Sequence, residues 1–143
     1  MKKIFFIILI GISLTTMSCS NNSEQTTAPQ QNEQGQTIIS KNVDVAEFSK
    51  LVNSAEGQVL DVRTPEEWAV GTIENATKMN FFDADFAEQL NGLDKNKAVY
   101  VYCKSGGRSG KATKKMKEMG FTTVYNLNGG IGAWTGAGKE IVK

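Results

Sequence analysis

The chain has 143 residues, of which 40% are hydrophobic and 22% are charged, and this composition is typical of one globular domain with an apolar core. It contains no histidine and two cysteines. These counts exclude a Ser-His-Asp triad, a Cys-His pair, a histidine metal site and a structural zinc site. A cysteine nucleophile here must therefore be activated by groups other than imidazole.

Residues 1–18 are predicted to be an export signal. A lysine pair gives a positive start, and residues 4–14 form an apolar run that is shorter than the about 20 residues of a membrane span. Ser18 followed by Cys19 resembles the cleavage box of bacterial lipoproteins, in which leucine is preferred at the position of Thr16. The resemblance implies that Cys19 is lipidated and anchors the exported protein to a membrane of the bacterial cell envelope. A cleaved signal with an incidental cysteine and an uncleaved anchor stay open as alternatives.

Residues 19–37 are predicted to be a disordered tether. From residue 20 to residue 37 the segment has no aromatic residue and no aliphatic residue larger than Ala28, so it cannot offset the entropy of ordering. A flexible tether of this length spans roughly 20 to 25 Å.

Without the lysine pair of the signal, the chain has 14 basic groups against 15 acidic groups, and this balance indicates no nucleic-acid partner.

Strand and helix patterns alternate along the remaining residues, 38–143. Asp44 is expected to cap the first helix, and Thr64 the second, with Pro65 at its first position. Such alternation is typical of an α/β domain with a mainly parallel central sheet, in which ligands bind beyond the carboxyl ends of the strands. We expect strands at residues 37–40, 58–63, 78–82, 98–103 and 122–128, and helices at residues 44–55, 64–68, 83–93, 108–120 and, after a glycine turn, within 129–138.

Cys103 ends the most apolar of these strands and begins a glycine-rich loop. Gly106 and Gly107 lead directly into a predicted helix, so the backbone N–H groups of the loop can turn towards the sulfur. Helix N-termini and nests of N–H groups lower the pKa of a cysteine from about 8.5. Lys104 and Arg108 add positive charge. We interpret Cys103 as an anion-stabilised nucleophile, and a buried core cysteine is the alternative.

Three segments resemble the motifs of the rhodanese family. LDVRTPEEWAVGTIENA, at residues 60–76, is similar to the first family motif, with Thr72 where the family usually has histidine. VYVYCKSGGRS, at residues 99–109, resembles the active-site loop, and VYNLNGGIGAW, at residues 124–134, resembles the C-terminal motif. The resemblance covers residues 38–143 and implies a three-layer α/β/α domain with a mainly parallel sheet.

The resemblance also implies a sulfurtransferase that works by double displacement. The Cys103 thiolate would attack the outer sulfur of thiosulfate or a similar donor, release sulfite and keep a persulfide until cyanide or a small thiol removes it. Lys104 and Arg108 would attract the donor, and the loop N–H groups with the hydroxyls of Ser105 and Ser109 would hold the sulfur. No metal or organic cofactor is required, and we expect a monomer.

The length of the loop distinguishes two chemistries on this fold. Cys103 and Arg108 are separated by four residues, as in sulfurtransferases of the family, whereas related phosphatases and arsenate reductases have one residue more. The shorter loop favours sulfur over a tetrahedral oxyanion. Two alternatives stay open: a noncatalytic module that binds a partner or carries sulfur, and a phosphatase or arsenate reductase.

Other charged and aromatic residues are interpreted as structural. Asp61 and Arg63 stand two positions apart at the end of a strand, and we expect them to form ion pairs with neighbours. Trp68 and Trp134 are expected to pack in the domain. The two adjacent glutamates of the second predicted helix point in different directions, so we do not interpret them as a pair of catalytic acids.

Overall fold

The computed structural model describes residues 30–31, 35, 37–54 and 56–143. The predicted export signal, Cys19 and most of the predicted tether lie outside these residues. Within the described part of the chain, no helix combines the length and apolar character needed to cross a bilayer.

Six strands form one sheet in the order β1-β2-β6-β5-β3-β4. Five of them are parallel, and β1 joins the edge strand β2 in the antiparallel direction. β5 therefore lies in the interior of the sheet, between β6 and β3. The strands are β1 (Gln30–Gln31), β2 (Thr37–Val43), β3 (Gln58–Asp61), β4 (Thr77–Lys78), β5 (Val99–Tyr102) and β6 (Thr123–Leu127).

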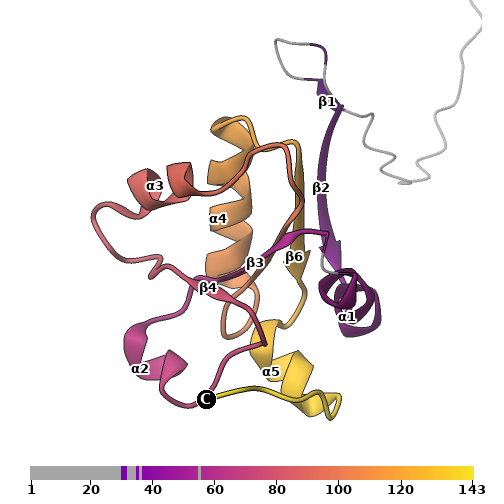
Figure 1. The fold of residues 1–143 in the computed structure, drawn as a ribbon, viewed down its shortest axis with the longest axis vertical. Helices are drawn as coiled ribbons and strands as arrows, with labels where there is room; N and C mark the ends of the chain where they lie inside the picture. The colour runs from indigo at the N-terminus through magenta and orange to yellow at the C-terminus, as the bar shows by residue number, and fades with distance from the viewer. Residues whose placement is uncertain (1–29, 32–34, 36, 55) are drawn as a thin grey trace, which may run out of the picture.

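Helices cover both faces of the sheet and complete the predicted three-layer α/β/α arrangement (Figure 1). Their side chains belong to separate core clusters on the two faces, as described below. The helices are α1 (Val45–Asn53), α2 (Pro65–Trp68), α3 (Phe86–Gln89) with the 3-10 turn η1 (Leu90–Gly92), α4 (Gly107–Glu118) and α5 (Gly130–Gly136).

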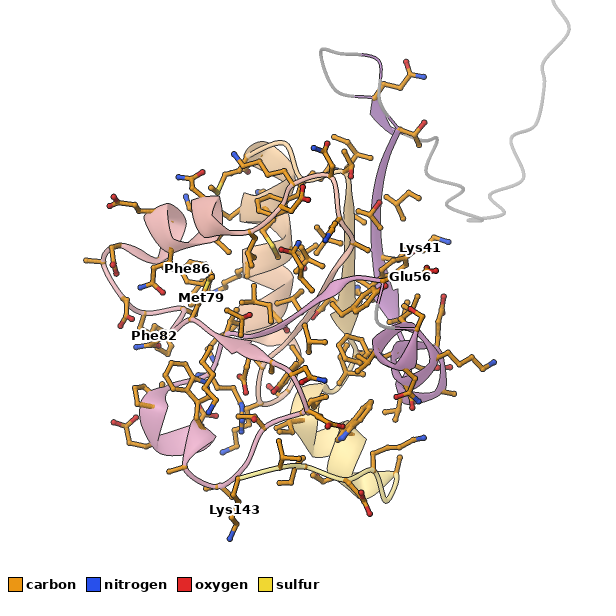
Figure 2. The ribbon with its side chains drawn as sticks, in the orientation of Figure 1. Lys41, Glu56, Met79, Phe82, Phe86 and Lys143 are labelled. Carbon is orange, nitrogen blue, oxygen red and sulfur yellow. The ribbon has the colours of Figure 1, made fainter. Side chains whose placement is uncertain are left out.

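The side chains of β5 alternate between two hydrophobic clusters. Val99 and Val101 pack in the cluster under α3 and α4, which includes Met79 and Phe86 (Figure 2). Tyr100 and Tyr102 pack in the opposite cluster, under α1 and α5. Because all four residues of β5 are buried, this strand gives the chain that follows it a rigid support.

The predicted helix caps are confirmed. The Asp44 carboxylate accepts the N–H of Glu47 at 2.8 Å and caps α1. Thr64 stands at the cap position of α2 with Pro65 as the first helical residue, and its N–H donates to the Glu67 carboxylate at 3.1 Å. The hydrogen bonds of a helix cap join residues within one turn of the chain, so caps can be predicted from the sequence alone.

The prediction of a strand at residues 78–82 is wrong beyond its first residue. β4 ends at Lys78, and the chain then turns, because the side-chain oxygen of Asn80 accepts the N–H of Phe82 at 3.1 Å. Asparagine side chains that bond the backbone two residues ahead favour turns over strands. The helix predicted at residues 83–93 is shorter than expected and consists of α3 followed by η1.

Candidate active site

Cys103 directly follows β5 at the carboxyl edge of the sheet. Its side chain is 1% exposed and belongs to the core cluster under α4. The neighbouring strands β3 and β6 end at the same edge, so the segments that follow them surround the cysteine. This is the position that the rule for open parallel sheets predicts for a ligand site.

Two groups of the following loop donate to the sulfur of Cys103. The backbone N–H of Gly106 lies 3.1 Å from Sγ, and the hydroxyl of Ser109 lies 3.4 Å from it. Gly106 has a φ of +96° and forms the N-cap of α4, a left-handed conformation that favours glycine. A Cβ at this position would also lie 3.3 Å from the backbone nitrogen of Gly129.

These donors change the acidity of the thiol. Burial acts to raise the pKa of Cys103, but the hydroxyl of Ser109 and the backbone N–H groups of Ser109, Ser105 and Gly106 act in the opposite direction, and the net pKa is lowered. Hydrogen bonds to the charged form of a group stabilise that form. The arrangement therefore favours a thiolate at Cys103.

Two backbone N–H groups at the N-terminus of α5 bind the carbonyls of Cys103 and Lys104, the first two residues of the loop. The N–H of Ile131 donates to the carbonyl of Cys103 at 2.8 Å, and the N–H of Gly132 donates to the carbonyl of Lys104 at 3.1 Å. Gly130 has a φ of +59°, and a Cβ there would collide with the carbonyl oxygen of Cys103. The glycines of the third motif thus allow α5 to approach the loop closely.

Arg108 is held by an ion pair that the sequence analysis did not predict. Its two terminal nitrogens lie 2.7 and 2.8 Å from the two carboxylate oxygens of Glu67, and its guanidinium also lies over the ring of Phe82, labelled in Figure 2, 5.6 Å from the ring centre. Glu67 is 24% exposed, and the hydrogen bonds from Arg108 lower its pKa to about 2. Glu67 also raises the pKa of Arg108, with a smaller contribution from the charge of Cys103.

A second ion pair confirms the structural interpretation of Asp61 and Arg63. The two residues bond to each other, with the closest contact 2.7 Å, and both are buried. Arg63 also donates to the backbone carbonyls of Glu67 and Gly71, at 3.1 and 2.6 Å. The pair therefore fixes the carboxyl end of β3 to α2 and to the segment after it.

The predicted loop residues have different surroundings. Ser109 is buried against the sulfur, whereas the side chains of Lys104 and Ser105 are exposed. Gly107 is the first residue of α4.

Among the residues that the structure describes, no group of three or more acidic or cysteine side chains is placed to hold a metal ion.

Two proteins of known name have sequences similar to this chain. A sulfurtransferase of Allochromatium vinosum is 33% identical over 93 residues, which are 65% of this chain and 85% of that protein. A tRNA uridine(34) hydroxylase of Pelagibacter ubique is 37% identical over 105 residues, which are 68% of this chain. This chain spans only 34% of that relative's length.

The fold is shared with a solved structure and with a family. The crystal structure of a rhodanese-like domain protein from Staphylococcus aureus is similar with a TM-score of 0.61 and 34% identity, over 72% of this chain and 98% of that one. Residues 44–137 match the family described as the rhodanese-like domain. Because this match covers more than half of the chain, runs from the start of α1 to the end of α5 and includes the Cys103 loop, the chain belongs to the rhodanese-like domain family.

Proposed function

We propose that this protein is a sulfurtransferase that carries sulfane sulfur on Cys103. The donor is thiosulfate or a similar compound, and the acceptor is a nucleophile such as cyanide or a small thiol. The proposal rests on one observation, which is the pair of hydrogen bonds from Gly106 and Ser109 to a sulfur atom at the carboxyl end of β5. The name of the Allochromatium vinosum relative is consistent with this chemistry.

In the first half-reaction the Cys103 thiolate attacks the outer sulfur of the donor. A bond forms between Sγ and that sulfur, the sulfur–sulfur bond of thiosulfate breaks, and sulfite leaves with the electron pair. The N–H groups at the start of α4 face the sulfur, so negative charge on the transferred atom is stabilised as it develops. No side chain has to act as a general base in this proposal, because the hydrogen bonds that lower the pKa of Cys103 increase the fraction of thiolate.

The cationic residues of the loop have unequal roles in this proposal. Lys104 is exposed beside the cysteine and attracts an anionic donor. Arg108 is neutralised in part by Glu67, so it chiefly orders the loop and adds a weaker attraction. In the second half-reaction a nucleophile attacks the outer sulfur, and Cys103 leaves as the thiolate that began the cycle.

The loop length supports sulfur chemistry over phosphate chemistry. Four residues separate Cys103 from Arg108, and the donors of the loop already contact Sγ itself. The matched segment covers about a third of the tRNA uridine(34) hydroxylase, so we assign to this chain only the chemistry that its own loop supports.

Mass spectrometry tests the proposal most directly. Purified protein is incubated with thiosulfate, and the peptide that contains Cys103 is expected to gain the mass of one sulfur atom while sulfite appears in equal amount. Cyanide should then remove the sulfur as thiocyanate. Absence of both products would leave a noncatalytic module, and hydrolysis of an aryl phosphate without sulfur transfer would indicate a phosphatase.

We also propose that the protein acts outside the cytoplasm, attached to a membrane through a lipid on Cys19. The support is the lysine pair, the short apolar run and the Ser18-Cys19 box of the sequence. Gln30, Gln31 and Thr37 of the predicted tether lie in β1 and β2, so residues 20–29 would connect Cys19 to the sheet, with a reach of roughly 16 to 19 Å if flexible. The test of this anchor is described in the Discussion.

A further inference from the structure

The outer side of α4 carries three lysines that the proposed sulfur chemistry does not use. Lys111, Lys114 and Lys115 are exposed, and their spacing of three and four positions places them on one side of the helix. The opposite side of α4 is buried and consists of Ser109, Ala112, Thr113 and Met116. The three lysines, which we call the lysine face, therefore point away from the sheet.

No acidic side chain forms an ion pair with the lysine face in the described part of the chain. The ion pairs within 4.0 Å there are Arg63 with Asp61 and Arg108 with Glu67. Like charges three or four positions apart on a helix repel each other, so the lysine face slightly destabilises its own helix. An arrangement that lowers local stability and makes no internal contact is typical of a surface that binds a partner.

The charges of the chain are unevenly distributed. After residue 18 the chain has 14 basic residues, and six of them lie in residues 104–117, a segment without any acidic residue. The remaining positions carry eight basic and fifteen acidic residues. An anionic surface therefore attracts the side of the domain that carries α4 and, on balance, repels the rest.

The chain leaves the sheet towards Cys19 beside the same helix. β1 pairs with β2 at the edge of the sheet, and β1 lies at the same end of the domain as the C-terminal end of α4 (Figure 1). The residues that line a hollow of about 510 Å³ between these strands and α4 are Gln31, Ile38, Lys114, Lys117 and Glu118. A lipid on Cys19 would thus hold the domain by the side that carries the lysine face.

The segment between Cys19 and β1 is short compared with the domain. If flexible, residues 20–29 span roughly 16 to 19 Å. A compact domain of about 100 residues has a radius of gyration of about 13 Å, so it is wider than this segment is long. The tether would therefore keep the lysine face at a high effective concentration beside the headgroups, where a weak attraction is enough to orient the domain.

We propose that the lysine face docks on the anionic phospholipid headgroups of the membrane that holds the lipid on Cys19. The inference rests on the proposed lipid anchor and goes beyond the proposed sulfur transfer. Each lysine close to an anionic bilayer increases the affinity about fivefold. The attraction acts within about 10 Å at moderate ionic strength, so it requires direct contact of α4 with the surface.

Docking gives the domain one orientation on the membrane. The helices α1 and α5 pack on the opposite face of the sheet from α4, so they face away from the bilayer. The Cys103 loop directly precedes α4 and begins the basic segment of residues 104–117. The sulfur carrier is therefore held near the membrane surface.

Lysine labelling tests this orientation on the protein produced from the full chain. The protein is purified from a bacterial host and placed in lipid nanodiscs of phosphatidylcholine alone, called neutral discs, or of equal parts phosphatidylcholine and phosphatidylglycerol, called anionic discs. A water-soluble acetylating ester then modifies the lysines, and mass spectrometry gives the rate at each one. We expect the lysine face to react at least about fivefold more slowly in anionic discs, the factor expected from a single lysine at such a surface.

Lysines elsewhere on the domain are the internal controls. Lys50 of α1 and Lys78 of β4 are exposed and should react equally fast in both kinds of disc. High salt should remove the difference at the lysine face, because it screens the attraction. Equal rates at the lysine face in both discs, or the same slowing at every lysine, would overturn the proposal.

A pair of triple variants tests whether the lysine face causes the docking. With Lys111, Lys114 and Lys115 replaced by glutamine, the neighbouring Lys117 should lose its protection in anionic discs. The matched control replaces three exposed lysines of other elements and should keep that protection; these are Lys50, Lys78 and Lys139. Both variants lose the same charge. Removing repulsion within α4 does not weaken the helix, and unchanged circular dichroism would verify this.

The anchor and the docking surface fail in different ways. The mass of the purified protein shows whether Cys19 carries a lipid. If it does not, the unlipidated protein is mixed with the same discs: slower labelling of the lysine face by anionic discs alone would reject the anchor and support the docking surface, and equal labelling would reject both. Protection by single-stranded RNA without protection by anionic discs would overturn the proposal in favour of a nucleic-acid surface.

Discussion

Glu67 and Arg108 are 41 positions apart in the sequence and join α2 to the first turn of α4 through two hydrogen bonds of 2.7 and 2.8 Å. The same carboxylate accepts the N–H of Thr64 at the start of α2. Glu67 therefore holds the loop arginine and caps its own helix at the same time. The cation that follows Cys103 most closely in the loop, Lys104, has no such partner among the described residues.

We predict that Glu67→Gln lowers the KM for thiosulfate, whereas Arg108→Ala raises it. The first change frees the charge of Arg108, and the second leaves the Glu67 carboxylate unpaired beside the loop, where it repels an anion. Loss of the ion pair should lower the free energy of unfolding by about 1 kcal/mol or less in either variant. Steady-state kinetics and urea unfolding measure the two effects separately.

The exposed glutamate Glu88 of α3 provides the control. Glu88→Gln removes the same charge at a site away from the loop and should leave the KM unchanged. If Glu67→Gln raises the KM for thiosulfate, then the ion pair assists donor binding and does not weaken it.

Replacing Cys103 with serine should abolish sulfur transfer and keep the fold. The serine hydroxyl is slightly smaller than the thiol, so it fits the same space, but it is far less acidic and less nucleophilic. Thiocyanate formation should fall to the rate measured without protein, and the circular dichroism spectrum should not change. Turnover by the Cys103→Ser variant would show that another group carries the sulfur.

The pH dependence of alkylation reports the acidity of Cys103. Because the folded protein lowers the pKa of this thiol, the rate of reaction with iodoacetamide should rise with pH around a midpoint below that of free cysteine. In Ser109→Ala the thiolate loses a hydrogen bond of 3.4 Å, so the midpoint should move to higher pH and the rate below the midpoint should fall.

Ser105→Ala is the matched control, because its side chain is exposed and its backbone N–H is retained. This variant should keep the wild-type midpoint. An unchanged midpoint in Ser109→Ala would mean that the backbone N–H groups alone set the acidity of the thiol.

Gly130→Ala should destabilise the domain and inactivate it. Its φ of +59° disfavours alanine, and the added Cβ would collide with the carbonyl of Cys103. We expect the free energy of unfolding to fall by about 1 to 3 kcal/mol. Gly136→Ala, at the other end of α5, has nothing within 4 Å of the added Cβ and should be neutral or stabilising by up to about 1 kcal/mol. Thermal and urea unfolding compare the two variants.

The lipid anchor is tested on the full chain in a bacterial host. Labelling cells with a radioactive fatty acid should mark the wild-type protein, which should partition into the detergent phase. Cys19→Ala should lose both the label and the partitioning. A wild-type protein that takes up no label and stays in the aqueous phase would be an unlipidated exported protein.

Much of the fold could be predicted from interactions between residues that are close together in the sequence. The helix caps at Asp44 and Thr64 were predictable because the bonds of a cap lie within one turn of chain. The buried strand before Cys103 was predictable from its continuous apolar run, which is typical of a strand covered on both faces. Residues 79–82 were misassigned because their apolar composition concealed the turn formed by the side chain of Asn80.

The position of Cys103 at the end of a strand, the glycines after it and the spacing to Arg108 could be predicted from the sequence, since all of these lie in one short segment. The partners of that segment depend on how the strands are ordered in the sheet. The order β6-β5-β3 brings α5 to the carbonyl of Cys103 and brings Glu67 of α2 to Arg108. Such contacts join residues far apart in the chain, and they exist only because parallel strands end at the same edge of the sheet.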